Sequence, residues 1–562
     1  PDFAEGHGIL GDILQGMGKP VEAVASYRRA LQIKPDFVEA HCNLAFALHD
    51  LRKLEEAASS YRQALKIAPD NAEAHCHLGN VLKDLKQFDD AIISARRALK
   101  IKPDFAEGHS NLGEVLLAQG RPDEAAACYR RALEIDPDFG AARSAFLFML
   151  NFLPNQSAAD LLAEAQRYGA LVARQARPYS DWRGTRDANR RLRVGFVSGD
   201  FRHHPVGFFL ESALKALADI VTGEWELIAY SNHLSNDVVT DRIKSFFHIW
   251  RNVVGLPDET LARRIHDDAI DILIDLSGHT ANNRLPVFAW KPAPVQVSWL
   301  GYFATTGVAA IDYFVADPWT APAFEELHFV EKIWKLPETR FIFTPPLENV
   351  DVSMLPSLEN GYITFGCFNN LSKITDDVVG VWARVLNAIP GSRLFLKAGQ
   401  LDDMAVRQVM LARFSAHGID EARIQLEGFT SRSSYLSTYN SVDISLDPFP
   451  YSGGATSAES LWMGVPVLTL SGERFISRQG VSLLMNVGLP EWVATDSDDY
   501  VARAVSHASD LQRLAALRRQ LRQQVRQSPL FEAPRFAMNF KAAIRNMWTT
   551  WCDQSQNPES TH

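Results

Sequence analysis

A repeat of 34 residues fills the first part of the chain and constrains its fold more than any other feature. The segments PDFAEGH, PDFVEAH, PDNAEAH and PDFAEGH begin at residues 1, 35, 69 and 103, and a degenerate copy, PDFGAAR, begins at residue 137. Small residues recur in register with them: Ala23, Ala57, Ala91 and Ala125, then Ala30, Ala64, Ala98 and Ala132. Residues spaced by four, seven and eight share one helical face, and proline ends a helix. Each copy therefore predicts two closely packed helices.

This period and composition are typical of the tetratricopeptide repeat, whose helix pairs stack into a superhelix with a concave groove. We assign residues 1–150 to this superhelix and residues 151–190, which still read as helix, to a linking and capping segment. The first copy begins partway through a repeat, so we expect the native chain to extend further upstream.

Two asparagines are candidates for binding an acceptor in the groove. Asn43 and Asn111 occupy the same position of the repeat, and side-chain amides in a row can bond the backbone of an extended peptide. The alternative is that both are solvated helix residues. Histidines also recur once per repeat, and we interpret them as structural positions and not as a metal site: His7, His41, His75 and His109.

From residue 191 the pattern changes to short apolar runs that alternate with helices. LRVGFVS, WELIAY, IDILIDL and VQVSWL predict strands of a first lobe, with helices near 207–219, 236–247 and 258–268. ITFGCF, SRLFLKA, RIQLEGF, VDISL and PVLTL predict strands of a second lobe, with helices near 376–389, 402–417, 431–441 and 456–463. Such alternation predicts doubly wound parallel sheets.

The predicted fold class is therefore multidomain α + α/β, an α-solenoid followed by two Rossmann-like lobes. We assign the remaining ranges as a first lobe at 191–345, a connector at 346–360, a second lobe at 361–530, and a C-terminal helix and tail at 531–562. The ligand is expected at the carboxyl ends of the strands, in a cleft between the lobes. The first strand is followed by VSGDFRHHP without GxGxxG, which disfavours a dinucleotide oxidoreductase.

Composition excludes several other classes. The net charge of −10 disfavours nucleic-acid binding, and no run of 18 uncharged apolar residues predicts a membrane span. The N-terminus, PDFAEGHGIL, lacks the basic and apolar regions of a signal peptide. The five cysteines are scattered without a CxxC pair, so neither disulfides nor a zinc site is predicted, and a reducing cytoplasm is the simplest compartment.

The stretch SVDISLDPFPYSGGATSAESLWMGVPVLTL, residues 441–470, predicts a strand, a turn, a helix and a second strand. Gly453 and Gly454 deliver a helix N-terminus to the carboxyl end of a strand, where unpaired N–H groups and the helix dipole suit a phosphate. Glu459, one turn into the helix, is placed to accept hydrogen bonds from ribose hydroxyls. The alternative is an ordinary turn between a strand and a helix.

The first lobe offers histidines as general bases. His203 and His204 follow the first strand, and a histidine facing the cleft suits proton transfer near neutral pH. His266, in RIHDD before strand IDILIDL, has a weaker claim, and His279 follows the carboxyl end of that strand. The alternative for each is a histidine that only bonds a loop.

The second lobe offers groups for a nucleotide. Lys373, in CFNNLSK after the first strand, is suited to stabilising a leaving nucleoside diphosphate, against the alternative of a surface lysine. Arg432 and Tyr435 follow strand RIQLEGF and suit a nucleoside by hydrogen bonding and stacking. Asp496-Ser497-Asp498 has the DxD form of metal–nucleotide sites, but it precedes a helix, where capping is the better interpretation, and we expect a metal-independent enzyme.

At these residues the chain resembles the O-linked N-acetylglucosamine transferase family, including its bacterial members and the plant SPINDLY-like relatives. The resemblance covers repeats and lobes and is carried by LRVGFVSGDFRHHP, RIHDD, KPAPVQVSWLGY, CFNNLSKI, SLDPFPYSGGATSAESLWMGVP, SRQG and SPLF. It implies the GT-B fold and inverting transfer from UDP-GlcNAc to serine or threonine hydroxyls without a metal or other cofactor. Protein or peptide acceptors would bind through the repeat groove.

The resemblance also implies roles for single residues. The family's proposed base histidines match His204 and His266, with His203 adjacent, and its diphosphate lysine matches Lys373. Its ribose carboxylate falls on Glu459. The remaining expected donor contacts are Asn370, Arg432 in place of a ribose lysine, Tyr435 in place of a uracil-stacking histidine, Gly301, Thr430, Gly453, and Gly454-Ala455-Thr456 in place of His-Thr-Thr.

Three alternatives remain open. SPINDLY-like relatives use GDP-fucose, so a protein O-fucosyltransferase of the same fold is the nearest one. A repeat scaffold whose lobes have lost activity is the second, and a transferase acting on glycans or small molecules is the third.

Overall fold

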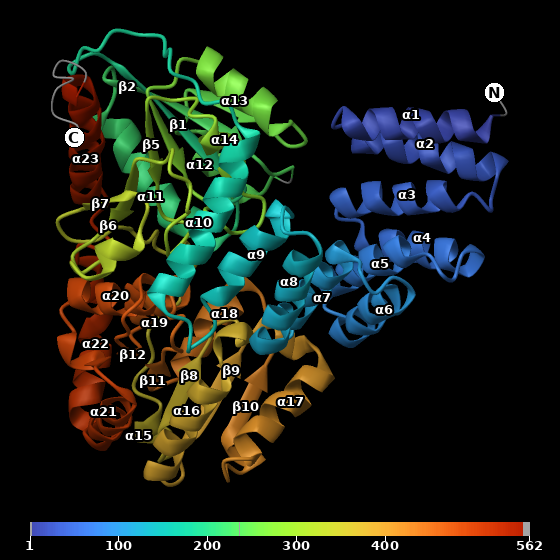
Figure 1. The fold of residues 1–562 in the computed structure, drawn as a ribbon. Coiled ribbons are helices and arrows are strands. Elements are labelled where there is room, and N and C mark those ends of the chain that lie inside the picture. The colour runs from blue at the N-terminus through green and yellow to red at the C-terminus, as the bar shows by residue number, and fades with distance from the viewer. Residues whose placement is uncertain (1–2, 235, 555–562) are drawn as a thin grey trace. The chain divides into compact units, whose positions relative to one another are not determined.

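The computed structural model describes residues 3–234 and 236–554, and Figure 1 shows their helices and strands. The chain separates into two compact units. One is residues 1–149 with the short segment 402–406, and the other is residues 150–401 with 407–562. The first residues of the repeat copy at residue 1 and most of the predicted C-terminal tail, residues 555–562, lie outside the described residues.

The first unit is built of antiparallel helix pairs, as the repeat predicts. Its recurring alanines are all fully buried, from Ala23 through Ala132, so that one helix of a pair lies close against the other. Gly11 allows the same close approach, since a Cβ there would lie 2.4 Å from the Tyr27 ring. The helices are α1 (Ala4–Gly16), α2 (Pro20–Ile33), α3 (Val38–Asp50), α4 (Leu54–Ile67), α5 (Ala72–Asp84), α6 (Phe88–Ile101), α7 (Ala106–Ala118), α8 (Pro122–Ile135) and α9 (Gly140–Leu150).

The repeated histidines are structural, as predicted. The Nε2 atoms of His41, His75 and His109 lie 2.9–3.0 Å from the carbonyl oxygens of Pro35, Pro69 and Pro103, six residues earlier in each case. Each ring therefore ties the start of a helix to the turn before it. The carbonyl equivalent for His7 belongs to residue 1, outside the described residues.

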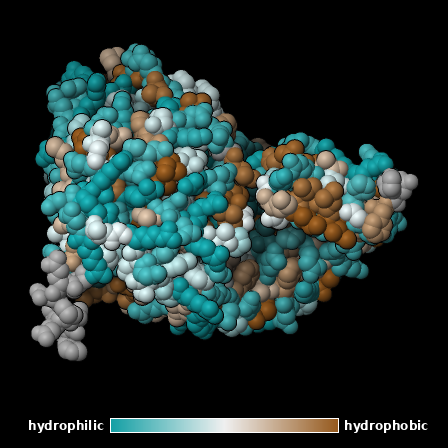
Figure 2. Space-filling model, turned by 90° about the horizontal axis from the view of Figure 1, so that it is seen from above, coloured by the Kyte–Doolittle hydropathy of each residue, from teal (hydrophilic) through white to brown (hydrophobic). Residues whose placement is uncertain are grey.

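Apolar side chains gather on α1, where Figure 2 shows a brown area on the surface of the repeats. Leu10 is 45% exposed, whereas its equivalents in the next three repeats, Leu44, Leu78 and Leu112, are each 6% exposed. The later leucines are buried because the second helix of the preceding pair packs against them.

The first lobe of the second unit is a parallel sheet in the order β3-β2-β1-β4-β5-β6-β7. Its first strand is the predicted LRVGFVS, and β3, β6 and β7 were not predicted. Its elements are α10 (Ala158–Gln175), β1 (Leu192–Ser198), α11 (Pro205–Ile220), β2 (Trp225–Ser231), α12 (Val238–Lys244), β3 (Ile249–Asn252), α13 (Asp258–Asp267), β4 (Ile272–Asp275), α14 (Leu285–Ala289), β5 (Val295–Ser298), β6 (Tyr313–Ala316), η1 (Glu325–His328) and β7 (Lys332–Lys335).

The second lobe has the order β10-β9-β8-β11-β12-β13, again parallel. In both lobes the strand order reverses beside the first strand, which is the arrangement of a Rossmann-like sheet. Its elements are α15 (Ser357–Asn360), β8 (Thr364–Cys367), η2 (Leu371–Lys373), α16 (Asp376–Ala388), β9 (Arg393–Lys397), η3 (Gly399–Asp402), α17 (Met404–Ser415), η4 (Glu421–Arg423), β10 (Ile424–Glu427), α18 (Arg432–Thr438), η5 (Tyr439–Ser441), β11 (Ile444–Leu446), α19 (Ala455–Trp462), β12 (Val467–Leu470), η6 (Phe475–Arg478), α20 (Gln479–Val487), η7 (Pro490–Trp492), β13 (Val493–Ala494), α21 (Ser497–Ser509), α22 (Leu511–Arg526) and α23 (Ala533–Gln554).

Helix α23 returns from the second lobe to the first, along whose side it runs in Figure 1. Lys541 of this helix donates to the carbonyl oxygen of Ile220 and to Glu224. No helix in the described part of the chain is long and apolar enough to cross a membrane.

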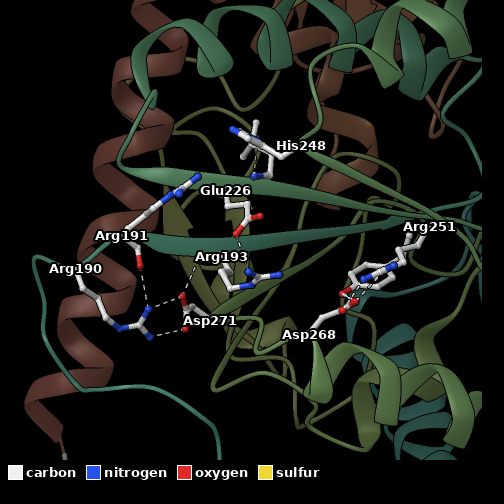
Figure 3. A network of polar contacts seen from close by, with 10 residues as sticks. Arg190, Arg191, Arg193, Glu226, His248, Arg251, Asp268 and Asp271 are labelled. Carbon is white, nitrogen blue, oxygen red and sulfur yellow. Dashed lines mark hydrogen bonds and ion pairs between the residues drawn. The ribbon is translucent and has the colours of Figure 1, made fainter.

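Ion pairs hold the amino-terminal edge of the first sheet (Figure 3). Arg190, from the segment before β1, makes a bidentate pair with Asp271 at 2.5 and 2.8 Å, and Asp271 also accepts from the backbone N–H of Arg193. Arg251, the third of the four residues of β3, pairs with Asp268 further along the strands in the same view and does not belong to this edge. This edge is therefore closed by protein contacts, and the opposite, carboxyl-terminal edge carries the candidate site.

Candidate functional site

The candidate site lies where the carboxyl ends of the two sheets face each other. His204 follows β1, Lys373 follows β8, and the turn 447–454 follows β11, so each stands at the point where its strand order reverses. Helices α11 and α19 begin here, and a Cβ on Gly454 would lie 3.7 Å from the Phe209 ring of α11. Two helix N-termini from different lobes therefore point into one region, which favours an anion.

A buried carboxylate organises the turn before α19. Asp447, 1% exposed, accepts hydrogen bonds from the backbone N–H of Gly453 at 2.6 Å and from the hydroxyls of Ser457 at 3.2 Å and Thr469 at 2.7 Å. Burial raises the pKa of Asp447 to about 6, against the effect of these donors. Gly453 is required, since a Cβ would lie 2.2 Å from the Ser457 hydroxyl.

Lys373 lies above this turn and is half-buried. Its Nζ donates to the carbonyl oxygen of Ser452 at 3.1 Å and to Oδ1 of Asn369 at 3.2 Å, and it stands 4.0 Å from the centre of the Tyr451 ring. The Thr456 hydroxyl donates to the same Asn369 oxygen at 2.9 Å. Burial lowers the pKa of Lys373 to about 8, and the Asp447 carboxylate opposes that shift. The structure thus brings Lys373 and the first turn of α19 together.

Asn370, predicted to contact the donor, has a different environment from its neighbour Asn369. Its Oδ1 accepts from the backbone N–H of Ser372 at 2.9 Å and from Gln400 at 2.7 Å. It caps the short helix that carries Lys373, and it does not contact the lysine amine. Asn369 is the asparagine that joins Lys373 to Thr456.

The predicted ribose and base residues form one cluster. Glu459, 2% exposed, pairs with Arg432 at 2.6 Å and accepts from the Tyr435 hydroxyl at 2.9 Å. The Tyr435 hydroxyl lies 3.3 Å from that of Tyr439, which donates to the carbonyl oxygen of Thr456 at 3.1 Å. Burial raises the pKa of Glu459 above its ordinary value, and Arg432 opposes this. Glu459 is thus held by protein groups on both oxygens.

This cluster reaches the first lobe through an aromatic contact. The Arg432 guanidinium lies 5.3 Å from the centre of the Phe208 ring on α11, and His203 meets the same ring edge-on at 4.9 Å. One predicted base histidine and three predicted nucleoside residues therefore meet across the two lobes.

His204 caps α11 and faces a carboxylate. Its Nδ1 accepts from the backbone N–H of Val206 at 3.3 Å and lies 3.5 Å from Oδ1 of Asp200, and its side chain is 32% exposed. Burial lowers the pKa of His204, and Asp200 opposes the shift. The ring is therefore neutral at neutral pH, as a general base must be.

His266 lies apart from this group. It ends α13, before the amino end of β4, whereas His204 follows the carboxyl end of the neighbouring strand β1, so the two stand at opposite edges of the sheet. Its Nε2 lies 2.9 Å from the carbonyl oxygen of Asp181, and its ring stacks on Tyr179 at 4.1 Å. His266 therefore anchors the segment before β1, and a role for it as a base stays a prediction that its position does not support.

His279 is also a core residue and not a group that lines the cleft. It is 2% exposed, its Nε2 lies 2.9 Å from the carbonyl oxygen of Thr306, and Tyr168 and Tyr302 meet its ring edge-on. Burial lowers its pKa to about 4. The expectation that it reaches the cleft is corrected because two tyrosines enclose it.

Two further predicted donor residues differ: Gly301 has a local explanation, whereas Thr430 does not. Gly301 packs against the end of β4, since a Cβ there would lie 1.9 Å from the carbonyl oxygen of Leu276. Thr430, at the carboxyl end of β10, has a buried hydroxyl with no hydrogen-bond partner among the described residues. A buried hydroxyl without a partner is uncommon and suits a ligand group.

The asparagine row in the repeats is not formed. Asn111 is 7% exposed, and its amide donates to the Cys76 sulfur at 2.9 Å. Asn43 is half-exposed and donates to Asp12 at 2.8 Å. The prediction for Asn111 is corrected because the preceding repeat covers it, and Asn43 remains available at the surface.

The DxD segment caps a helix, as predicted. Asp496 Oδ1 accepts from the backbone N–H groups of Asp498 and Asp499, both at 2.9 Å, at the start of α21. No group of three or more His, Cys, Asp or Glu side chains in residues 3–234 and 236–554 is arranged to hold a metal ion.

Comparison with known proteins identifies the family. A family model described as glycosyl transferase family 41 matches residues 166–345 and 350–540, and tetratricopeptide models match segments between residues 11 and 139. The chain belongs to glycosyl transferase family 41. A solved structure of a mutant of the Thermobaculum terrenum O-GlcNAc transferase is similar to this chain, with a TM-score of 0.87 and 34% sequence identity. The match covers 92% of this chain and 98% of the transferase chain. This similarity confirms the predicted fold class.

Plant members of family 41 are also similar. The probable UDP-N-acetylglucosamine–peptide N-acetylglucosaminyltransferase SPINDLY of Petunia hybrida is 38% identical over 413 residues, which is 72% of this chain and 44% of that protein. The corresponding SEC protein of Arabidopsis thaliana is 30% identical over 65% of this chain and 38% of its own length. The chain spans less than half the length of these plant relatives.

Proposed function

We propose that this chain is an inverting, metal-independent glycosyltransferase that moves GlcNAc from UDP-GlcNAc to serine or threonine hydroxyls of proteins. The observation that carries the proposal is the position of Lys373, whose ammonium lies beside the first turn of α19 and opposite the histidine turn of α11. Family membership and the similarity to proteins named as peptide N-acetylglucosaminyltransferases support it.

In this reaction the second lobe stabilises the leaving group. The acceptor oxygen forms a bond to the anomeric carbon while the bond from that carbon to the diphosphate oxygen breaks. The electron pair goes to the diphosphate, whose growing negative charge meets Lys373 and the N-terminal N–H groups of α19. Both are in place before the reaction, because Asp447 and Asn369 hold the turn and the lysine.

The first lobe removes the acceptor proton. His204 is neutral near pH 7, because burial lowers its pKa. For Nε2 to accept the proton, Nδ1 must carry a hydrogen and turn from the Val206 N–H to Asp200, now 3.5 Å away. Such contacts commonly tighten when substrate binds. Asp200 would then stabilise the imidazolium that forms.

The repeats would supply the protein acceptor. Asn43 presents its amide at the surface of α3, next to Asp12 of the preceding repeat. Side chains of this kind bond a peptide backbone without selecting its sequence, which suits an enzyme with several protein substrates.

A second donor, GDP-fucose, is the alternative that the SPINDLY-like resemblance implies. The stronger match to a SPINDLY protein, 38% against 30% for SEC, favours keeping it. Glu459, paired with Arg432, also stands where the resemblance places an aspartate in animal enzymes.

Thermal-shift assays with UDP, UDP-GlcNAc, GDP and GDP-fucose decide between the donors. A ligand present at 100 times its Kd stabilises the folded protein by about 2.7 kcal/mol. We expect this shift with UDP and UDP-GlcNAc. A shift with only the guanine nucleotides would replace the donor, and no shift with any of them would favour the inactive scaffold.

A further inference from the structure

The first residues after α9, Asn151 to Leu153, are buried although they have no regular structure, whereas Pro154, Asn155 and Ser157 further along are exposed. Leu150, Asn151, Phe152 and Leu153 are at most 8% exposed. Connecting segments usually run over the surface, because buried backbone groups need partners. Arg474, itself 6% exposed, supplies them by donating to the carbonyl oxygens of Leu150 at 3.3 Å and Leu153 at 2.8 Å.

Phe152 of this segment touches the donor turn. Its ring centre lies 4.8 Å from that of Tyr451, and Phe303, from the loop after β5, meets Tyr451 from another direction at 5.2 Å. Tyr451 is 7% exposed and carries the Lys373 ammonium at 4.0 Å from its ring centre. Two segments far apart in the sequence, those of Phe152 and Phe303, therefore fix the ring on which the proposed diphosphate lysine rests.

The contact with Tyr451 matters for the position of Lys373. A cation attracted to an aromatic face is held most strongly where water is excluded, and Lys373 is half-buried. Its other partners, Ser452 and Asn369, bond the amine from the sides. If the ring moves, the amine follows it or loses the contact, and its alignment with the first turn of α19 changes.

We propose that Phe152 is a positioning residue of the donor site: by fixing the Tyr451 ring it sets the position of the Lys373 ammonium. The segment that holds Phe152 begins at residue 150, directly after the last residue of the repeat unit. The inference rests on the proposed function in so far as Lys373 binds a nucleoside diphosphate.

The test compares two buried phenylalanines six residues apart. Phe152 is 5% exposed and contacts Tyr451, while Phe146 is 6% exposed and contacts Tyr129 within the repeat unit. Phe152→Ala and Phe146→Ala create cavities of the same kind. We expect both to lower Tm, but only Phe152→Ala to weaken UDP binding, by about tenfold in calorimetric titration, with the donor KM rising more than kcat falls.

Tyr451 provides the second arm and covers the case in which Phe152→Ala fails to fold. Tyr451→Phe keeps the ring and is expected to bind UDP within about twofold of wild type, whereas Tyr451→Leu is expected to bind about tenfold more weakly. Equal UDP affinity in wild type and Phe152→Ala, or equal losses in Phe152→Ala and Phe146→Ala, overturns the inference. So does Tyr451→Leu binding as tightly as Tyr451→Phe.

Titration of the wild-type protein separates this inference from the proposed function. If wild type binds neither UDP nor GDP, the proposed function fails and the inference fails with it. If wild type binds a nucleotide that Phe152→Ala binds equally well, only the inference fails.

Discussion

The turns at the carboxyl edges of the two sheets are built in opposite ways. In the second lobe Asp447 and Glu459 are at most 2% exposed, and both carboxylates are held by several donors. In the first lobe His203 is exposed, and the His204 side chain is 32% exposed with contacts of 3.3 and 3.5 Å. Under the proposed function this difference is expected, because a diphosphate is always the same group and is stabilised by fixed charges, whereas acceptor hydroxyls on different proteins need an open approach.

Lys373→Ala should have the largest effect on transfer, because it removes the positive charge that the buried turn of the second lobe presents to the diphosphate. We expect kcat/KM for transfer to fall about 1000-fold, which is the upper range for loss of one such group. The fold should remain, since the variant removes a partly desolvated charge. Steady-state kinetics and circular dichroism check this, with the exposed Lys332→Ala as control. If the Lys373→Ala variant keeps a tenth of the activity, stabilisation of the leaving diphosphate does not depend on Lys373.

His204→Ala tests the more exposed histidine turn of the first lobe. Loss of a general base should lower kcat by about 100-fold or more, with little change in UDP affinity. His266→Ala is the matched variant: it should leave kcat within a few-fold and cost about 1–2 kcal/mol of stability, because it removes a hydrogen bond and a ring stack. The reverse result, with His266→Ala inactive and His204→Ala active, would remove His204 from the mechanism.

Asp447→Asn tests whether the turn before α19 depends on the buried Asp447 carboxylate. The amide nitrogen must face either the Gly453 N–H, which cannot accept, or the Thr469 hydroxyl, which must then accept instead of donate, and in both cases the hydrogen bonds to a charged acceptor are lost. We expect UDP affinity to fall about tenfold and stability to fall by about 1.5–3 kcal/mol. The control, Asp498→Asn, changes a side chain that is 87% exposed. Unchanged UDP affinity in Asp447→Asn would mean that the turn holds its shape without the charge.

The pH dependence of kcat/KM should report on both turns, through His204 in the first lobe and Lys373 in the second. Its effect should be smaller than that of the substitutions above. His204 must be neutral, and its pKa is below its ordinary value, so kcat/KM rises with pH on the acid side. Lys373 must be charged, and its pKa is about 8, so kcat/KM falls as the pH rises through 8. Lys373→Arg should move the alkaline limb above pH 10, because arginine stays protonated. An alkaline limb that stays near 8 in this variant must belong to another group.

The sequence predicts the elements whose signal is periodic. The 34-residue repeat and the apolar runs of the central strands determine both units, because register and burial follow directly from spacing. Short strands such as IWRN (β3) and KIWK (β7) escape prediction because charged and polar residues interrupt their apolar pattern. Lys373 and the turn before α19 were predictable because parallel strands end at one edge.

What the sequence did not predict depends on partners far apart in the chain. Asp447 accepts from Thr469, and Asn369 accepts from Thr456 in the other half of the lobe. Asn111 matches Asn43 in the repeat, yet Cys76 of the preceding repeat buries it. The place of His266 was available from topology, since a helix that leads into a parallel strand ends at the amino edge. Except for His266, the residue types could be recognised in the sequence, but their environments could not.

A crystal structure with UDP bound tests the central claim most directly. The diphosphate should lie within hydrogen-bond distance of Lys373 Nζ and of the first backbone N–H groups of α19, with the nucleoside beside Arg432, Tyr435 and Glu459. A UDP molecule bound elsewhere, with Lys373 still bonded only to Ser452 and Asn369, would contradict the assignment of this turn as the donor site.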